Sequence, residues 1–391
     1  MDAVEGIVLD LLHWGDHGLG RQVPASWLGE HGADAEYYIG SPSNRLKMSN
    51  LIKSIRLPVE ARRPARDTEE FADYQARDHQ NFNLFFGVPL LLEIENRGFQ
   101  KYVKHWALFV QGCHLLLQKE IIRENINLAH TLMTRFIISF EDVYGEAGGR
   151  EHMTYNAHIT FHAAENALRW GPAWAMNAYW FEAGNKVLKA VIASGRGIAS
   201  QVCRAISKEC AIQILQVLCG STETDKFLHD IKKDLVEGCI YIGDDSYLGT
   251  QRRFVPTAGE QWLCARQHLD TSAFVQVEKL IHLSCVYAPD DKNLKTNNSV
   301  AYLKNNTYVF IEKIVVSEAD SQGYLIVRKI HETPMMVLEG VHHQLAFLRR
   351  IEFIEGDSSL ISPNDLDTIC ARITMPKGDY IIKMPNIFNT C

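Results

Sequence analysis

The chain has 391 residues, of which 46% are hydrophobic and 22% are charged, and its formal net charge is −7. This length allows two or three domains with an ample core, and the composition is ordinary for a globular protein. The negative balance excludes a uniformly basic coat for nucleic acid, so any contact with DNA has to come from a local patch.

Cysteine usage and the lack of sorting signals indicate the compartment. Nine cysteines are scattered along the chain without a Cys-x-x-Cys pair, which is typical of proteins in a reducing environment. The acidic start lacks the basic lead of a signal peptide, and no apolar run approaches the roughly 18 residues of a membrane span. We therefore expect an intracellular protein that is not secreted and has no membrane partner.

The first 66 residues predict a helix, a loop and a basic segment. Apolar positions recur at helical spacing over residues 2–14, whereas residues 15–44 are rich in Gly, Pro, Ser and Asp. Residues 45–66 then carry seven cations against one acid, Glu60, and are the best candidate for a surface that contacts phosphates. A solvated charged face is the alternative, which is the usual role of charge runs. The candidate cations are Arg45, Lys47, Lys53, Arg56, Arg62, Arg63 and Arg66.

Three core helices are predicted next. The first covers residues 73–93 and is interrupted near Pro89. Two longer amphipathic helices follow, with apolar positions spaced from Val103 to Leu117 and from Ile126 to Val143. Gly145 is expected to end the last of them. Their short connection predicts antiparallel neighbours in a bundle.

The most unusual composition lies near the middle of the chain. It predicts a helix capped by Asn156, a break at Gly171 and Pro172, and a second helix beyond. His158 and His162 are four residues apart, a spacing that can present two zinc ligands on one helix face. Because neither a His-Glu-x-x-His order nor a cysteine pair accompanies them, a row of polar side chains packed against neighbouring helices is the favoured interpretation.

Glu182 lies on the second of these helices, at the edge of its apolar face. Its spacing alone indicates an ordinary helical ion pair with Lys186, which contributes about 0.2–0.5 kcal/mol.

Beyond residue 190 the pattern changes from helical to strand-like. Residues 198–236 predict two more helices, and two hairpins follow at residues 308–330 and 372–384. The predicted fold class is therefore α+β, with a mainly helical N-terminal part and a small β-rich C-terminal module. The predicted domains are residues 1–150, a helical insertion-type domain with the basic segment 45–66; residues 151–236, a helical segment with His158, His162 and Glu182; and residues 237–391, the β-rich module.

The motif around the two histidines resembles the C-terminal half of CACTA (EnSpm-like) DNA transposases, and animal transposase domain-containing proteins in particular. The resemblance covers roughly residues 1 to 200 well, and it departs from the family at Glu5, where the family's Asp-x-x-His motif has its histidine. Besides Glu182, the matching residues are Asp2, Asn156, His158, His162, Gly171 and Pro172.

This resemblance implies an RNase H-like core with an Asp-Asp-Glu catalytic set and a large helical insertion before the glutamate. Glu182 is then the third catalytic carboxylate and a ligand of Mg²⁺ or Mn²⁺. The family's first two catalytic aspartates lie upstream of the motif that begins at Asp2, so we expect this chain to lack them. A metal pair needs several hard oxygen ligands, and we therefore expect no activity from the chain alone.

The resulting expectation is a transposase-derived protein, related to metal-dependent DNA cleavage and strand transfer in transposition. Transposon-end DNA and further copies of the chain are its expected partners, and the nucleus is its expected location. One alternative is a DNA-binding or protein-interaction module that a host has retained, which would use residues 45–66 and the β-rich module. The other alternative is a non-functional transposon remnant, which could remain in the cytoplasm.

Overall fold

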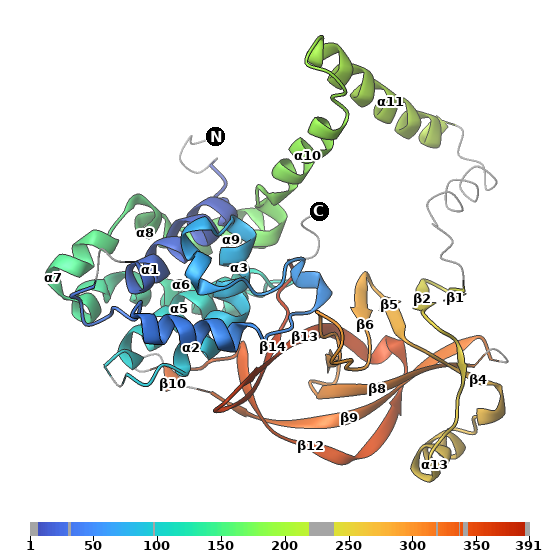
Figure 1. The fold of residues 1–391 in the computed structure, drawn as a ribbon. Coiled ribbons are helices and arrows are strands. Elements are labelled where there is room, and N and C mark those ends of the chain that lie inside the picture. The colour runs from blue at the N-terminus through green and yellow to red at the C-terminus, as the bar shows by residue number, and fades with distance from the viewer. Residues whose placement is uncertain are drawn as a thin grey trace.

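The computed structural model describes residues 7–29, 33–96, 98–218, 238–317, 320–335, 337–338 and 343–387. Helices dominate the N-terminal part and strands the C-terminal part, which confirms the α+β class. Figure 1 shows the helices up to α9 gathered beside the β-rich module, whereas α10 and α11 extend away from both.

Up to residue 176 the helical part consists of short helices around two long ones, and its last helix, of 21 residues, is longer than either. Their bounds are η1 Leu12–Leu19, α1 Gly20–Leu28, α2 Pro42–Ile52, η3 Val59–Ala61, η4 Thr68–Asp73, α3 Ala76–Asn81, η5 Phe82–Phe86, α4 Gly87–Leu92, α5 Gln100–Leu116, α6 Arg123–Ile138, α7 Phe140–His152, α8 Tyr155–Thr160, α9 Ala163–Trp170, η6 Ala173–Met176, α10 Tyr179–Ala190 and α11 Ile198–Leu218. Helix α5 is buried on nearly all sides and packs against α6, so it is the centre of this part.

The prediction for the N-terminus is wrong in two places. The helix expected over residues 2–14 is not helical at its described residues before Leu11, and the first half of the loop expected over residues 15–44 is helical. Trp14 and Trp27 are both buried on this helical run. Gly20 lies so close to a neighbouring asparagine that a Cβ there would overlap its amide. The small residues that suggested a loop therefore allow close packing between helices.

Helices α5 and α6 confirm the two long helices, except that α6 ends at Ile138 and the last predicted residues, up to Val143, belong to α7. The helix predicted over residues 73–93 is present as a continuous helical run from Ala76 to Leu92, in which η5 is a π-helical stretch between α3 and α4. Pro89 lies in α4, which continues directly from η5, so the interruption predicted near Pro89 is not a break in this helical run. Gly145 marks a break, with φ of 76°, but α7 continues beyond it where a loop was predicted.

The β-rich module contains the strands β1 Ile240–Ile242, β2 Asp245–Leu248, β3 Arg252–Arg253, β4 Phe274–Val277, β5 Lys279–His282, β6 Cys285–Tyr287, β7 Val300–Leu303, β8 Tyr308–Ser317, β9 Gln322–Pro334, β10 Val337–Leu338, β11 His343–Gln344, β12 Leu348–Ile361, β13 Leu366–Met375 and β14 Gly378–Lys383. It also contains α13 Ala258–Arg266, η7 Thr271–Ala273 and η8 Pro363–Asp365. The two predicted hairpins are confirmed as β8–β9 and β13–β14.

The main sheet is antiparallel and closes on itself. Its order is β3-β4-β8-β7-β13-β14-β12-β9, and β9 also pairs with β8, so that the six strands from β8 to β9 form a closed sheet. Strands β4 and β3 extend from it as a free edge, and β1, β2, β5 and β6 form a second sheet. Closure leaves the apolar side chains of one face in a shared interior.

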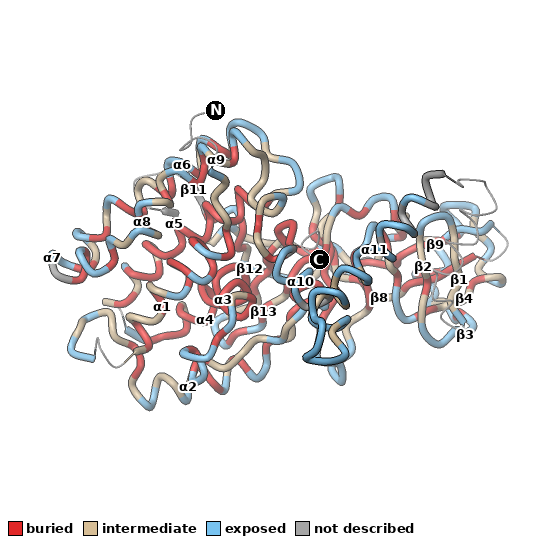
Figure 2. The backbone as a smooth tube through the Cα atoms, turned by 90° about the horizontal axis from the view of Figure 1, so that it is seen from above, coloured by how far each residue is buried: buried red, intermediate tan, exposed pale blue. Residues whose placement is uncertain are grey.

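The helical part and the closed sheet share one hydrophobic core. The buried cluster that contains Trp106 of α5 also contains Ile311 of β8. Gln111 Oε1 accepts a hydrogen bond of 2.7 Å from the Ala346 N–H, and His114 stacks on Phe347 with ring centroids 4.6 Å apart. Figure 2 shows buried backbone running through both parts, whereas α11 is exposed.

Glu60 is the most informative polar contact between the two parts. Its carboxylate accepts hydrogen bonds from the Val286 N–H at 2.6 Å and from the Asn298 side-chain amide at 2.8 Å. Burial is the main cause that raises the pKa of Glu60. The one acid of the basic segment therefore does not face the surrounding cations but joins that segment to the β-rich module.

We expect Glu60→Ala to lower the free energy of unfolding by about 1–3 kcal/mol, because the half-buried Val286 N–H and the buried Asn298 amide each lose a hydrogen bond. Urea unfolding at neutral pH measures this change. Glu69→Ala removes an exposed carboxylate from the same region and should leave stability nearly unchanged. Equal stabilities of the two variants would contradict the assigned role of Glu60.

Candidate functional site

Two segments that carry the transposase resemblance lie against each other, although they are far apart in the sequence. The Asn166 side-chain amide donates a hydrogen bond of 3.3 Å to the Ile7 carbonyl. The Ala178 N–H donates one of 2.6 Å to Asp10 Oδ1. Helix α8 also packs on η1. Asp2 lies outside the described residues, so its position relative to this site is not defined.

Asn156 is not the helix cap that its position predicts. The N-cap of α8 is Thr154, and the Asn156 side chain lies against η1 instead. A Cβ at Gly18 would come within 2.9 Å of the Asn156 amide. The Asn156 side chain on α8 therefore packs directly against Gly18 on η1, where a larger residue would not fit.

His158 and His162 are both exposed, which contradicts the expectation that they pack against neighbouring helices. Their ring centroids are 5.3 Å apart, and His162 Nδ1 lies 3.3 Å from Glu165 Oε2. A turn after Thr160 separates α8 from α9, so the single predicted helix is in fact two. In the described part of the chain, no three His, Cys, Asp or Glu side chains come together as a metal site would require.

The predicted break at Gly171 and Pro172 is confirmed. Gly171 has φ of 91°, a conformation that favours glycine, and it ends α9. Pro172 caps the short helix η6. The chain then enters α10, on which Glu182 occupies the first turn.

Glu182 is exposed, and its helix begins at a firmly held point. The backbone at the start of α10 is fixed by Asp10 and by Asn177, whose Oδ1 accepts a hydrogen bond of 3.2 Å from the Tyr179 N–H. The side chain of Lys186, the predicted ion-pair partner of Glu182, is outside the described ones. The position of Glu182 on its helix is therefore well defined. In the described residues, however, no further carboxylates lie around it to complete a metal site.

A buried polar network lies directly beneath this point, and no local sequence pattern indicates it. Asp16 Oδ2 accepts hydrogen bonds from the Tyr179 hydroxyl at 3.0 Å and from Gln80 Nε2 at 2.8 Å. The Arg77 guanidinium lies 4.1 Å from the centroid of the Tyr179 ring. Burial raises the pKa of Asp16 from 3.8 to about 7. The network holds Tyr179, one helical turn before Glu182, to the body of the protein.

This pKa makes stability depend on pH in a defined direction. Because the folded pKa of Asp16 lies above the unfolded value, its contribution is fully present below about pH 4 and is lost as the pH rises through about 7. Asp16→Asn removes the titration and keeps an oxygen for the Tyr179 hydroxyl. We expect the variant to gain stability relative to the wild type, by on the order of 2–3 kcal/mol, between about pH 5 and about pH 8.

Urea unfolding of both proteins across this pH range measures that difference. Burial lowers the pKa of several histidines to about 4, which also makes stability depend on pH, but these histidines are present in both proteins and cancel in the comparison. A difference that stays constant with pH would show that Asp16 is not the titrating group.

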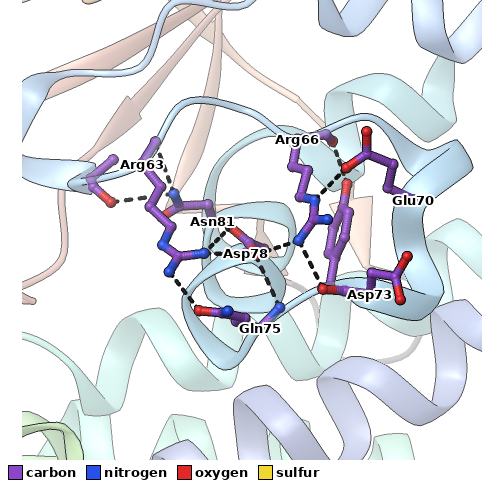
Figure 3. A network of polar contacts seen from close by, with 9 residues as sticks. Arg63, Arg66, Glu70, Asp73, Gln75, Asp78 and Asn81 are labelled. Atoms are coloured by element: carbon purple, nitrogen blue, oxygen red, sulfur yellow. Dashed lines mark hydrogen bonds and ion pairs between the residues drawn. The ribbon is translucent and has the colours of Figure 1, made fainter. Parts of the chain in front are cut away.

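Most of the cations in the basic segment, residues 45–66, bind other groups of the same chain. Arg63 donates to Asp78 at 3.0 Å and to Gln75 Oε1 at 2.5 Å, and Arg66 donates to Glu70 at 2.7 Å and to the Asp73 carbonyl at 2.8 Å (Figure 3). The other candidates follow the same rule: Arg45 donates to the Gly40 and Leu28 carbonyls, Lys47 to Glu93 and Glu95, and Arg56 to Asp290 and Asp291. Lys53 and Arg62 are exposed. These contacts join α2, α3 and the β-rich module, and they leave little of the segment's charge for phosphates.

We expect the double variant Arg63→Ala, Arg66→Ala to lower the free energy of unfolding by about 2–3 kcal/mol. The reason is that Asp78 is only 3% exposed and would lose both guanidinium partners. Urea unfolding measures the change, and Lys53→Ala is the control for loss of a positive charge from the same segment. Unchanged stability together with weaker binding to DNA would instead support a phosphate-contacting role.

Comparisons of the chain with family models, with curated proteins and with solved structures found no match. None of the helices in the described residues combines the length and the apolar composition that crossing a bilayer requires.

Proposed function

We propose that this protein derives from a CACTA-type DNA transposase and retains the helix of its third catalytic carboxylate, with Glu182 at that position. The supporting observation is the contact between the segments that carry the resemblance. Asp10, next to the first motif, caps the helix of Glu182 through the Ala178 N–H. Residues of a functional motif have to meet in space, and this contact supports the proposal because it joins segments that are 168 positions apart in the sequence.

The same geometry argues that the chain does not cut DNA by itself. Two-metal cleavage and strand transfer need several carboxylate ligands around the reacting phosphate. Asp10 and Asp16 do not supply them, because Asp10 caps α10 and Asp16 is buried under hydrogen bonds. The parent chemistry thus requires acidic residues from outside the described part of the chain. On this proposal the partners are transposon-end DNA and other copies of the chain, and the location is the nucleus.

The transcript and the genomic DNA upstream of the Met1 codon test this descent. We expect an in-frame upstream segment, or its decayed remains, that encodes two aspartates on strand-like runs. A transcript that begins near Met1, with unrelated DNA before it, would contradict the proposal.

Biochemistry tests the role of Glu182. We expect the purified chain to be inert toward transposon-end DNA with Mg²⁺ or Mn²⁺. A protein extended by the upstream segment should nick that DNA, and Glu182→Gln should abolish the nicking because one metal ligand is lost. Glu165→Gln, an exposed carboxylate on the preceding helix, is the matched control and should retain activity. Nicking by the present chain alone, or an active Glu182→Gln variant, would overturn the assignment.

A further inference from the structure

A pocket lies where the second half of α5 meets one end of the β-rich module, and we call it the α5 pocket. Its volume is about 530 Å³, within the range of about 300–1,000 Å³ that small-molecule sites occupy. Helix α5 forms one wall. The opposite wall comes from the turn between β5 and β6, the residues before β12 and the residues after β14. Sites for small molecules are common at such junctions between two parts of a fold.

Helix α5 places two buried polar side chains on the wall of this pocket. Gln111 and His114 are three residues apart, so they lie on one face of the helix. They are only 2% and 7% exposed. A buried polar group needs a hydrogen-bond partner, and each of these side chains has its partner on one side only. One polar group of each side chain is therefore free.

The free group of Gln111 is a hydrogen-bond donor. Gln111 Oε1 accepts from the Ala346 N–H at 2.7 Å and from the Phe347 N–H at 3.3 Å. Because a backbone N–H only donates, these two contacts fix the orientation of the amide, with the oxygen toward the backbone. Among the described residues, Gln111 Nε2 has no acceptor. Its two protons are available to a ligand.

The free group of His114 is a hydrogen-bond acceptor. His114 Nε2 lies 2.9 Å from the Leu84 carbonyl oxygen, which can only accept, so Nε2 carries the ring proton. Burial lowers the pKa of His114 to about 4, so the ring is neutral at pH 7 and Nδ1 keeps its lone pair. No donor to Nδ1 is present in the part of the chain that the structure describes. The α5 pocket thus presents a donor and an acceptor on neighbouring turns of one helix.

Asn386 adds an amide from the β-rich module. Its backbone N–H donates to the Leu117 carbonyl at 2.8 Å, which fixes its position at the end of α5. Its Nδ2 is buried and has no hydrogen-bond partner within the described ranges. A buried polar atom without a partner destabilises a fold, so its presence beside a pocket calls for an explanation. A bound ligand supplies the missing partner.

The charges around the α5 pocket cancel. Lys383 Nζ lies 2.7 Å from Asp367 Oδ2, and the two form an ion pair. Lys119 and Glu120 are both exposed and have opposite charges. Burial raises the pKa of Cys285 to about 12, which keeps its thiol neutral. An uncharged polar ligand therefore suits the pocket better than an anion or a cation.

The turn between β5 and β6 is strained where it borders the pocket. Leu283 and Ser284 have φ of 49° and 65°, a region that side chains other than glycine rarely adopt. Asn-Gly is the usual sequence of such two-residue hairpin turns. Leu283 is also 63% exposed. Strained backbone is often kept at ligand sites, and here it holds an apolar side chain beside the polar wall.

We propose that the α5 pocket binds an uncharged nucleoside. Gln111 Nε2 and Asn386 Nδ2 donate to acceptors of the base, and His114 Nδ1 accepts from a neighbouring N–H. Each common nucleobase carries a donor beside an acceptor on its pairing edge, which is the pattern that protein pockets use to identify single bases. The sugar offers hydroxyls to Ser284 and Thr368, which both line the pocket. The proposal does not depend on the transposase descent.

Isothermal titration calorimetry of the full chain with adenosine, guanosine, cytidine and uridine tests the proposal. The corresponding 5′-monophosphates are the charged probes, and ribose is the probe without a base. We expect at least one nucleoside to bind at a single site. Its monophosphate should bind no more tightly, because the charges around the pocket cancel, and ribose alone should not bind.

The decisive variant is Asn386→Leu. It should weaken nucleoside binding about tenfold, because a hydrogen bond to the ligand is lost. It should not lower the thermal unfolding midpoint, because the amide makes no hydrogen bond to the described chain. His114→Phe keeps a ring beside Phe347 but removes the Nδ1 acceptor, and should weaken binding by a similar factor. Asn127→Leu, at an exposed position of α6, is the matched control and should leave binding unchanged.

Three results would overturn the proposal. The first is the absence of binding for every nucleoside. The second is unchanged affinity in both Asn386→Leu and His114→Phe, which would place the nucleoside elsewhere on the protein. The third is tighter binding of a monophosphate that Lys119→Ala abolishes, which would show that the pocket selects an anion.

Discussion

Buried carboxylates constrain this fold more than any other polar feature, because a buried negative charge needs partners that replace water. Asp16, Glu60 and Asp78 are each less than 9% exposed. Glu60 takes its partners from the β-rich module, Asp16 from α3 and the start of α10, and Asp78 from the arginines that follow η3. These three acids therefore determine how the β-rich module, α10 and the basic segment are attached to the helical body.

Because buried acids bind nearby cations, the positive charge visible in the sequence is not all available at the protein surface. A basic segment suggests a binding surface only as long as its cations are free, and in residues 45–66 most of them are bound within the fold. The arginines at positions 252, 253 and 266 are fewer and less conspicuous in the sequence, yet the structure leaves all three side chains exposed. Available charge, rather than the density of cations along the chain, decides where an anionic partner can bind.

Hydrophobic periodicity correctly predicted the helices and strands whose formation depends on a local sequence pattern. Helices α5 and α6 and the two hairpins needed only apolar spacing over many residues, which carries no information about partners. The sequence failed where small or polar residues are buried: Gly20 suggested a loop and Asn156 a helix cap. Asp16 gave no local sign of its hydrogen bond to Tyr179, 163 residues further on. In the candidate site, the helix of Glu182 and the break before it were predictable, whereas the network that holds this helix was not.

On the proposed descent, several residues that carry the resemblance have a structural role in this chain. Asn156 packs against Gly18, and Gly171 adopts the positive φ that ends α9. These residues suit the fold whether or not the protein acts on DNA, so their presence is weak evidence of chemistry. Glu182 differs, because its side chain is exposed on the first turn of α10 and makes no hydrogen bond to the described network around Asp16. A substitution of Glu182 should therefore leave the stability of the fold nearly unchanged. A loss of activity in such a variant would then reflect the chemical role of the carboxylate.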